Sequence, residues 1–261
     1  MFKFCSLFSG SSGNSSLVQT NSTKILIDAG ESAKKIAESL ISLNIDPKEI
    51  NGIIVTHEHS DHTKGIGVFS KKYDIPVYAN YETWESMHSQ KEKIKDENIK
   101  FFNFEKFNIG DLTIEPFPIP HDAANPCGFN IYNNNNKISI ATDIGHLTSS
   151  VVDSLSNSSF ILLESNYDLN VLKCSPYPYL LKQRISGPNG HLSNDDAGKT
   201  ISYLVNTGLK SVMLGHLSKE NNFPELTYKT VADYLIENKI ENKIDLSVAS
   251  RYTTSQIIDI G

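Results

Sequence analysis

Residues 56–65, THEHSDHTKG, crowd histidines and carboxylates directly after the apolar run 52–55. Imidazole and carboxylate groups this close together are typical ligands of a divalent cation. His57 and His59, two apart where an extended strand ends, can point to the same side. Asp61 and His62 diverge at the start of the next turn. One short motif can therefore supply ligands to two metal ions.

Other histidines and acids stand in places of the same kind. His121, Asp143 and His216 each come directly after an apolar run. Because strand ends gather at one edge in α/β sites, we expect these side chains to converge with the first motif. The predicted metal ligands are His57, His59, Asp61, His62, His121, Asp143 and His216. Nitrogen and oxygen donors without cysteine suit Zn²⁺ or Mn²⁺, and ligand type does not decide between them.

Short apolar runs bounded by turn residues predict the strands that must position these ligands. The expected strands are 2–8, 16–20, 24–28, 53–56, 76–79, 112–119, 128–132, 137–141, 160–163, 212–214 and 246–249. Helical spacing appears at 32–43, 194–205 and 225–236. The tetrad 133–136, all asparagine, predicts a hairpin turn. Strands mixed with helices, and no long linker, predict one α/β domain over 1–261.

Composition narrows the class of protein. The chain is 39% hydrophobic and has a net charge of −6. This charge argues against broad nonspecific binding of nucleic acid but does not exclude a local basic groove. Cys5, Cys127 and Cys174 are scattered, so neither a disulfide framework nor a thiolate zinc site is expected. No run is long enough to span a bilayer and no signal peptide is recognisable, so we expect a cytoplasmic protein without membrane contact. Nothing indicates an oligomeric state.

In ligand type, order and spacing, this set resembles the metallo-β-lactamase-fold hydrolases. Further stretches along nearly the whole length are similar to the YycJ/WalJ group of that superfamily: SGSSGNSS, LIDAG, THEHSDH, PHDAANPCGF, ATDIGH, LLESNYD, GHLSNDDAG and LGHLSKENN. The resemblance implies a four-layer αββα sandwich with the metals at one edge of two packed sheets. It also implies exonuclease activity on DNA, with two divalent metal ions as cofactors.

The resemblance also distributes the ligands. It places His57, His59 and His121 on one ion, Asp61, His62 and His216 on the other, and Asp143 between the two. Two cations that share one water can generate a bridging hydroxide, the expected nucleophile. Asp61 is additionally expected to orient that nucleophile.

Glu164 and His191 are further candidates for catalysis. Glu164 ends the apolar run 160–163, and His191 precedes the predicted helix 194–205. In tRNA-processing relatives of the fold, a comparable pair supplies a proton to the departing oxygen, which suggests His191 as general acid oriented by Glu164. In the alternative interpretation, Glu164 supports a ligating histidine and His191 only begins a helix. Arg184 is either a phosphate contact or a surface residue.

Three classes of function remain open. The first is cleavage of phosphodiesters in DNA as an exonuclease, or in RNA as a processing nuclease. The second is hydrolysis of a small molecule such as a lactam, thioester or cyclic nucleotide, which the same ligands could perform and which the acidic net charge favours. The third is a metal-stabilised binding protein without turnover. Cleavage polarity and strand preference are not indicated.

Overall fold

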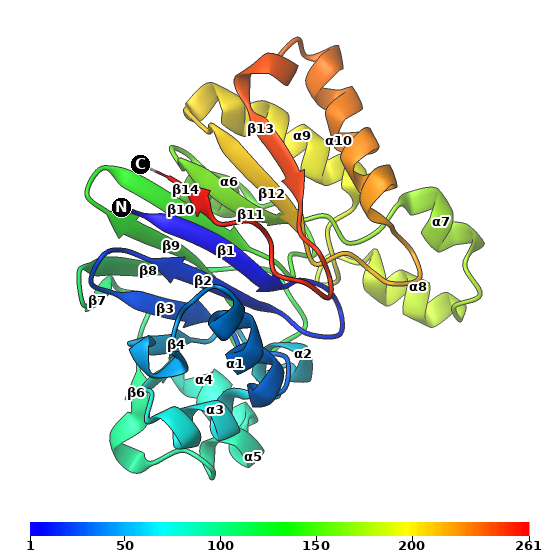
Figure 1. The fold of residues 1–261 in the computed structure, drawn as a ribbon. Coiled ribbons are helices and arrows are strands. Elements are labelled where there is room, and N and C mark those ends of the chain that lie inside the picture. The colour runs from blue at the N-terminus through cyan, green and yellow to red at the C-terminus, as the bar shows by residue number, and fades with distance from the viewer. Residues whose placement is uncertain (261) are drawn as a thin grey trace.

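Two seven-stranded sheets pack face to face in the computed structural model, which describes residues 1–260 (Figure 1). The first sheet has the order β14 (Ile258–Asp259), β1 (Lys3–Phe8), β2 (Ser15–Gln19), β3 (Lys24–Ile27), β4 (Gly52–Ile54), β5 (Val77–Ala79) and β6 (Ile99–Phe101). The second has the order β13 (Asp245–Val248), β12 (Ser211–Gly215), β11 (Phe160–Glu164), β10 (Asn136–Ala141), β9 (Cys127–Asn133), β8 (Leu112–Pro118) and β7 (Phe107–Ile109).

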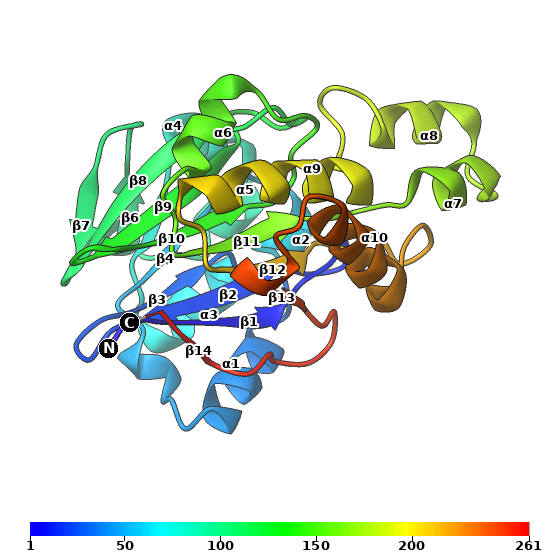
Figure 2. The same cartoon turned by 90° about the horizontal axis from the view of Figure 1, so that it is seen from above.

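Helices cover the outer faces of both sheets. On the side of the first sheet lie α1 (Ala33–Ser42), α2 (Ser60–Thr63), α3 (Ile66–Tyr73), α4 (Tyr81–Ser86) and α5 (His88–Lys91). The connections between the strands of the second sheet contain α6 (Ser149–Leu155), α7 (Leu169–Cys174), α8 (Tyr179–Ile185), α9 (Asn194–Leu204) and α10 (Pro224–Glu237). Short 3₁₀ helices occupy Pro47–Glu49, Asp96–Asn98, Val205–Thr207 and Glu241–Lys243. Viewed from above, α9 and α10 lie over the second sheet, and α7 and α8 project beyond it (Figure 2).

Three separate apolar cores define the layers. Leu40 of α1 and Phe69 of α3 pack against the first sheet. Phe4 and Phe160 belong to the core between the two sheets. A third core, which includes Ile201 of α9, lies between the second sheet and α6, α9 and α10. This arrangement confirms the predicted αββα sandwich.

The direction of the strands brings loop residues together. In the second sheet, β10, β11, β12 and β13 are parallel, and β8 runs the same way because both β8 and β10 pair antiparallel with β9. In the first sheet, β3, β4 and β5 are parallel. The carboxyl ends of parallel strands lie at one edge of a sheet, so the loops after β8, β10, β11 and β12 share that edge.

The predicted helices are confirmed with small shifts at their ends. In α1, the Ser32 side chain accepts a hydrogen bond from the Lys35 N–H, while Ile36 and Leu40 are buried on one face. The asparagine tetrad is a hairpin turn as predicted, with Asn134 at φ +52°. The sequence patterns did not predict β6, β7 and β14, because these short strands lack the run of adjacent apolar residues that marks β4 and β5.

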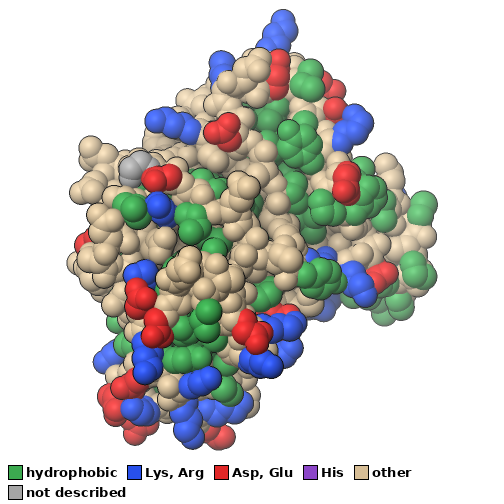
Figure 3. All heavy atoms as spheres, viewed as in Figure 1, with side chains coloured by type: hydrophobic (Ala, Val, Ile, Leu, Met, Phe, Trp, Pro, Cys, Tyr) green, Lys and Arg blue, Asp and Glu red, His purple; other side chains and the backbone are tan. Residues whose placement is uncertain are grey.

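Charged side chains are of mixed sign. On the face shown in Figure 3, acidic and basic groups alternate, most densely over the helices that cover the first sheet, and neither sign forms a broad field. Within residues 1–260, none of the helices combines the length and the apolar character that a membrane span requires.

Replacing Phe4 by Ala should lower the free energy of unfolding by about 3–5 kcal/mol, since it removes a fully buried ring and leaves a cavity. The ring of Phe4 lies 4.6 Å from that of Phe160, centroid to centroid, so the change loosens the contact between the sheets. Urea denaturation measures the effect. Tyr203→Ala removes an aromatic ring that is 56% exposed and should change stability by less than about 0.5 kcal/mol; equal effects of the two changes would contradict the expectation.

Candidate metal centre

The structure brings all seven predicted metal ligands to one edge of the sandwich. Possible ligand atoms of His57, His59 and His121 lie within 4.8 Å of one another. The same is true of Asp61, His62 and His216. The two groups match the two sets that the resemblance implies. The first draws its members from both sheets, because His121 follows β8 whereas His57 and His59 follow β4.

Asp143 lies between the two groups. Its Oδ2 atom is 3.1 Å from His62 Nε2. Its Oδ1 atom is 3.6 Å from His121 Nε2 and 3.5 Å from His216 Nε2. One carboxylate thus approaches histidines of both groups, which is the geometry expected of a bridging ligand.

The backbone is held in an unusual conformation at the site. Asp143 and His216 have φ values of +60° and +56°. This left-handed region costs a residue other than glycine about 1–3 kcal/mol, and such strain concentrates at functional sites. The His216 N–H donates a hydrogen bond of 2.8 Å to Ser9 Oγ, which ties the end of β12 to the loop between β1 and β2. The two sheets are therefore connected beside the cluster.

Asp28 is a member of the site that sequence reasoning missed. Its Oδ2 atom accepts hydrogen bonds from His62 Nδ1 at 2.8 Å and from Thr56 Oγ1 at 2.8 Å. Its Oδ1 atom accepts from the Thr56 N–H at 2.9 Å. With Nδ1 engaged in this way, His62 presents Nε2 to Asp143. The signal was available, because Asp28 directly follows β3, much as Asp143 comes two residues after the end of β10.

Glu164 makes both of the contacts that the sequence had left as alternatives. Its Oε1 atom accepts a hydrogen bond of 2.8 Å from His191 Nδ1 and one of 2.9 Å from His216 Nδ1. Its Oε2 atom accepts from the backbone N–H groups of Ile144 and Leu192 at 2.7 and 3.2 Å. The fully buried carboxylate is thus satisfied on both oxygens. It orients His191 and supports His216 at the same time.

The electrostatic environment of the cluster stabilises ionised carboxylates and protonated histidines. Burial alone would raise the pKa of Asp143, but the neighbouring His216 and His62 outweigh it and hold that pKa well below its usual range. Burial acts to lower the pKa of His216, but Asp143 and the hydrogen bonds to Asp61 and Glu164 raise it to about 10. In the metal-free protein, protons on histidine therefore neutralise the carboxylates. A divalent cation can take the place of those protons.

The donor atoms fit divalent metals. His57 Nε2 is buried and has no hydrogen-bond partner. Unpaired buried polar atoms are rare and costly, so this nitrogen calls for a cation. Burial keeps the pKa of His57 well below its usual range, which leaves the imidazole neutral and able to ligate. The seven residues contain no cysteine, a composition that suits zinc or manganese.

Arg184 lies at the rim of the cluster. Its Nε atom donates a hydrogen bond of 2.6 Å to Asp122 Oδ2, and Asp122 follows His121 in the chain. The Arg184 side chain is 61% exposed, so its remaining donors face solvent.

Tyr179 of α8 is 72% exposed on the projecting helical segment.

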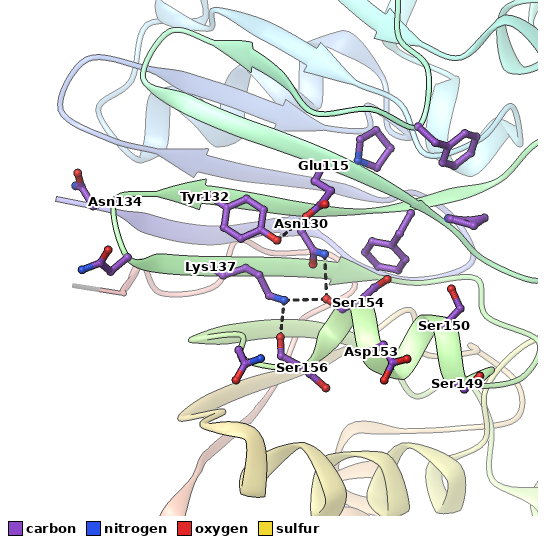
Figure 4. A pocket seen from close by; sticks show the side chains of 16 residues that line it. Glu115, Asn130, Tyr132, Asn134, Lys137, Ser149, Ser150, Asp153, Ser154 and Ser156 are labelled. Atoms are coloured by element: carbon purple, nitrogen blue, oxygen red, sulfur yellow. Dashed lines mark hydrogen bonds between the residues drawn. The ribbon is translucent and has the colours of Figure 1, made fainter.

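A large cavity lies apart from this cluster. It has a volume of about 850 Å³, lies on the outer face of β8, β9 and β10, and contains no histidine (Figure 4). Its buried Lys137 donates hydrogen bonds of 2.8 and 2.6 Å to the carbonyls of Ser154 and Ser156. This lysine joins β10 to the end of α6 and has a structural role. The histidine cluster, and not this cavity, is the candidate for chemistry.

The αββα sandwich with a histidine and aspartate cluster at one edge defines a class of metallohydrolase. The family model described as "Metallo-beta-lactamase superfamily" matches residues 9–184, and the chain belongs to that superfamily. Solved structures agree on the fold. The metallo-β-lactamase fold protein YhfI from Bacillus subtilis has a TM-score of 0.73 at 14% identity, over 98% of this chain and 100% of that one. The short form of human tRNase Z has a TM-score of 0.69 at 14% identity, over 99% of each chain.

Within the superfamily, the chain falls in the WalJ/YycJ group. It is 37% identical over 257 residues to "Exodeoxyribonuclease WalJ" of Streptococcus pneumoniae serotype 2, which covers 97% of this chain and 94% of the relative. It is also 37% identical over 235 residues to "Exodeoxyribonuclease YycJ" of Bacillus anthracis, covering 90% of this chain and 89% of the relative. The resemblance found in the sequence is confirmed.

Asp28→Ala should destabilise the metal-free protein by at least about 1–3 kcal/mol, because it leaves buried donors on Thr56 and His62 unpaired. The pKa of His62 should also fall, since Asp28 is one of the carboxylates that raise it against the opposing effect of burial. Urea unfolding and an NMR titration of the histidines measure the two effects. Asp153→Ala, at an exposed carboxylate on α6, should change neither the stability nor the titration of His62. An unaltered His62 titration in Asp28→Ala would contradict the contact between Asp28 and His62.

Proposed function

We propose that the chain is a dinuclear metal-dependent phosphodiesterase that acts on DNA as an exonuclease, formed by one domain over 1–261. The convergence of seven nitrogen and oxygen ligands in two groups that share Asp143 carries the proposal of a metal centre. The choice of DNA rests on the relatives named exodeoxyribonuclease, which match the chain over nearly its whole length.

The ligands are assigned to two divalent ions, zinc or manganese. His57, His59 and His121 would hold one ion, Asp61, His62 and His216 the other, and Asp143 would contact both. When bound, such a pair of cations polarises the phosphate oxygens and lowers the pKa of water to near neutrality, which supplies hydroxide as the nucleophile. Because protons compete for the same histidines, metal affinity should fall as the pH is lowered.

Asp61 is suited to orient the attacking water. Burial alone would raise its pKa, but His62 and His216 outweigh that effect and lower it, so the side chain is ionised and accepts hydrogen bonds. Its Oδ2 atom lies 3.4 Å from Asn14 Nδ2, which donates to it and limits its rotation. A fixed carboxylate acceptor at the cluster can hold a water molecule in line with a phosphorus atom.

His191 is suited to protonate the departing oxygen. Burial opposes its protonation, but the Glu164 carboxylate at 2.8 Å outweighs burial and raises the pKa of His191. The side chain is 22% exposed, in contrast to His216 at 1%, so it can reach a substrate. A protonated imidazole beside the cluster fits the role of general acid.

Hydrolysis of a small molecule remains the second candidate. The net charge of −6 and the mixed signs on the face in Figure 3 give no broad attraction for a polyanion. An assay should therefore offer a lactam reporter beside nucleic acids.

Purified protein with Mn²⁺ or Zn²⁺ should shorten end-labelled DNA, and a chelator should abolish this activity. Asp143→Ala should reduce cleavage by more than about a hundredfold, a larger loss than supporting residues usually cause, because it removes the shared ligand. Elemental analysis should show less bound metal. Asp153→Ala, at an exposed carboxylate, is the matched control and should keep both properties. Turnover of the lactam reporter without any cleavage of single-stranded or duplex DNA would reject the nuclease in favour of the second candidate.

His191→Ala should lower the turnover number by roughly 10²–10⁴-fold with unchanged metal content, as expected for loss of a general acid. The pH profile of the residual cleavage rate should no longer show the titration of a histidine. His146→Ala is the matched control, because His146 lies near the site but is exposed and bonded to the Pro188 carbonyl. Unchanged turnover in His191→Ala with normal metal content would leave His191 as a structural residue only.

A further inference from the structure

A second cavity, of about 470 Å³, lies next to the chain segment that carries His216. Its walls include Ser9 and Leu217. Leu217 is the residue after His216, and Ser9 Oγ accepts the hydrogen bond of the His216 N–H. Further parts of the wall come from the start of α10 and from the segment after β13. The volume is within the range of about 300–1,000 Å³ that is common for small-molecule sites.

Two exposed aromatic side chains line this cavity. Phe223 is 51% exposed and Tyr252 is 64% exposed. They come from different parts of the chain, since Phe223 directly precedes α10 and Tyr252 follows β13. Large aromatic groups left in water beside a reactive centre provide flat apolar surfaces for a ring of the substrate. Nucleobases have such rings, and stacking on an aromatic side chain stabilises each base by a measurable amount.

The charge of the lining suits an anion. Lys219 and Arg251 are among the lining residues, and no carboxylate is, although the chain as a whole has 30 acidic and 24 basic residues. Lys219 also lies 3.9 Å from Glu220, so Arg251 is the stronger candidate for an anion contact.

Arg251 is held in place at the edge of the cavity. Its Nη2 atom donates to the Leu217 carbonyl, which fixes the guanidinium next to the loop that carries His216. A Cβ atom at Gly10 would lie 2.6 Å from Arg251 Nη1, so the glycine leaves the space that the guanidinium needs. The guanidinium has further N–H donors, and a planar fork of this kind matches a phosphate group.

We propose that this cavity, the Tyr252 pocket, binds a nucleotide of the substrate strand next to the scissile phosphate. The base packs against Tyr252 and Phe223, and the backbone phosphate contacts Arg251. The inference rests on the proposed nuclease function and extends it to a substrate form. A base paired within a duplex cannot enter a pocket of this kind, so the centre acts on an unpaired strand or a frayed end. Because stacking tolerates every base, the pocket confers little sequence preference.

Binding measurements can test the pocket separately from catalysis. The probe is a fluorescent single strand of about ten thymidines, with phosphorothioate linkages that resist cleavage, measured by anisotropy with Mn²⁺ present. A second probe has the same backbone and no bases. Tyr252→Ala and Phe223→Ala should each weaken binding of the thymidine strand roughly tenfold and leave the abasic strand unaffected. Tyr203→Ala, at a similarly exposed tyrosine on α9, should leave the dissociation constants of both strands unchanged.

The outcomes separate this inference from the function it extends. If wild-type protein binds both probes equally, or if Tyr252→Ala and Phe223→Ala bind the thymidine strand like the wild type, the pocket does not hold a base, while DNA cleavage by the wild type would leave the nuclease proposal intact. If the wild-type protein neither binds nor cleaves any DNA, the nuclease proposal itself fails, and the Tyr252 pocket with it.

Discussion

The central constraint on this molecule is the burial of several carboxylates beside one group of histidines. Asp28, Asp143 and Glu164 are all almost inaccessible to solvent, and Asp61 is close to them. Negative charges that are removed from water must be balanced by positive charge nearby. In the metal-free protein that charge comes from protonated histidines, as the raised pKa of His216 indicates. The unpaired Nε2 atom of His57 shows that protons alone do not satisfy the whole cluster.

The packing of the two sheets holds these charged side chains in place. Each sheet contributes ligands from the ends of its strands, so the distance between His57 and Asp143 depends on how the two sheets pack. The core between the sheets, in which Phe4 contacts Phe160, sets that distance. The hydrogen bond from His216 to Ser9 connects the sheets a second time, at the site itself. Rigid packing therefore compensates the strained backbone at Asp143 and His216.

The surroundings of the centre are asymmetric. The only two arginines of the chain are held by residues next to different ligands: Arg184 is bonded to Asp122 next to His121, and Arg251 to the carbonyl of Leu217 next to His216. Local cations of this kind can guide a polyanion although the net charge is −6. The exposed aromatic residues of the Tyr252 pocket lie on the Arg251 side only.

The sequence by itself determined the ligand types and their order, because metal ligands that directly follow apolar strands leave a local pattern. The sandwich was implied by the resemblance to a known family. His57, Asp143 and His216 were recognisable for that reason. Only the tertiary structure decided which carboxylate supports which histidine: Asp28 bonds to His62 across 34 positions, and Glu164 bonds to both His191 and His216. The Tyr252 pocket also depends on residues far apart in the chain. Hydrogen bonds and cavity walls of this kind arise from packing between distant segments, which no local spacing records.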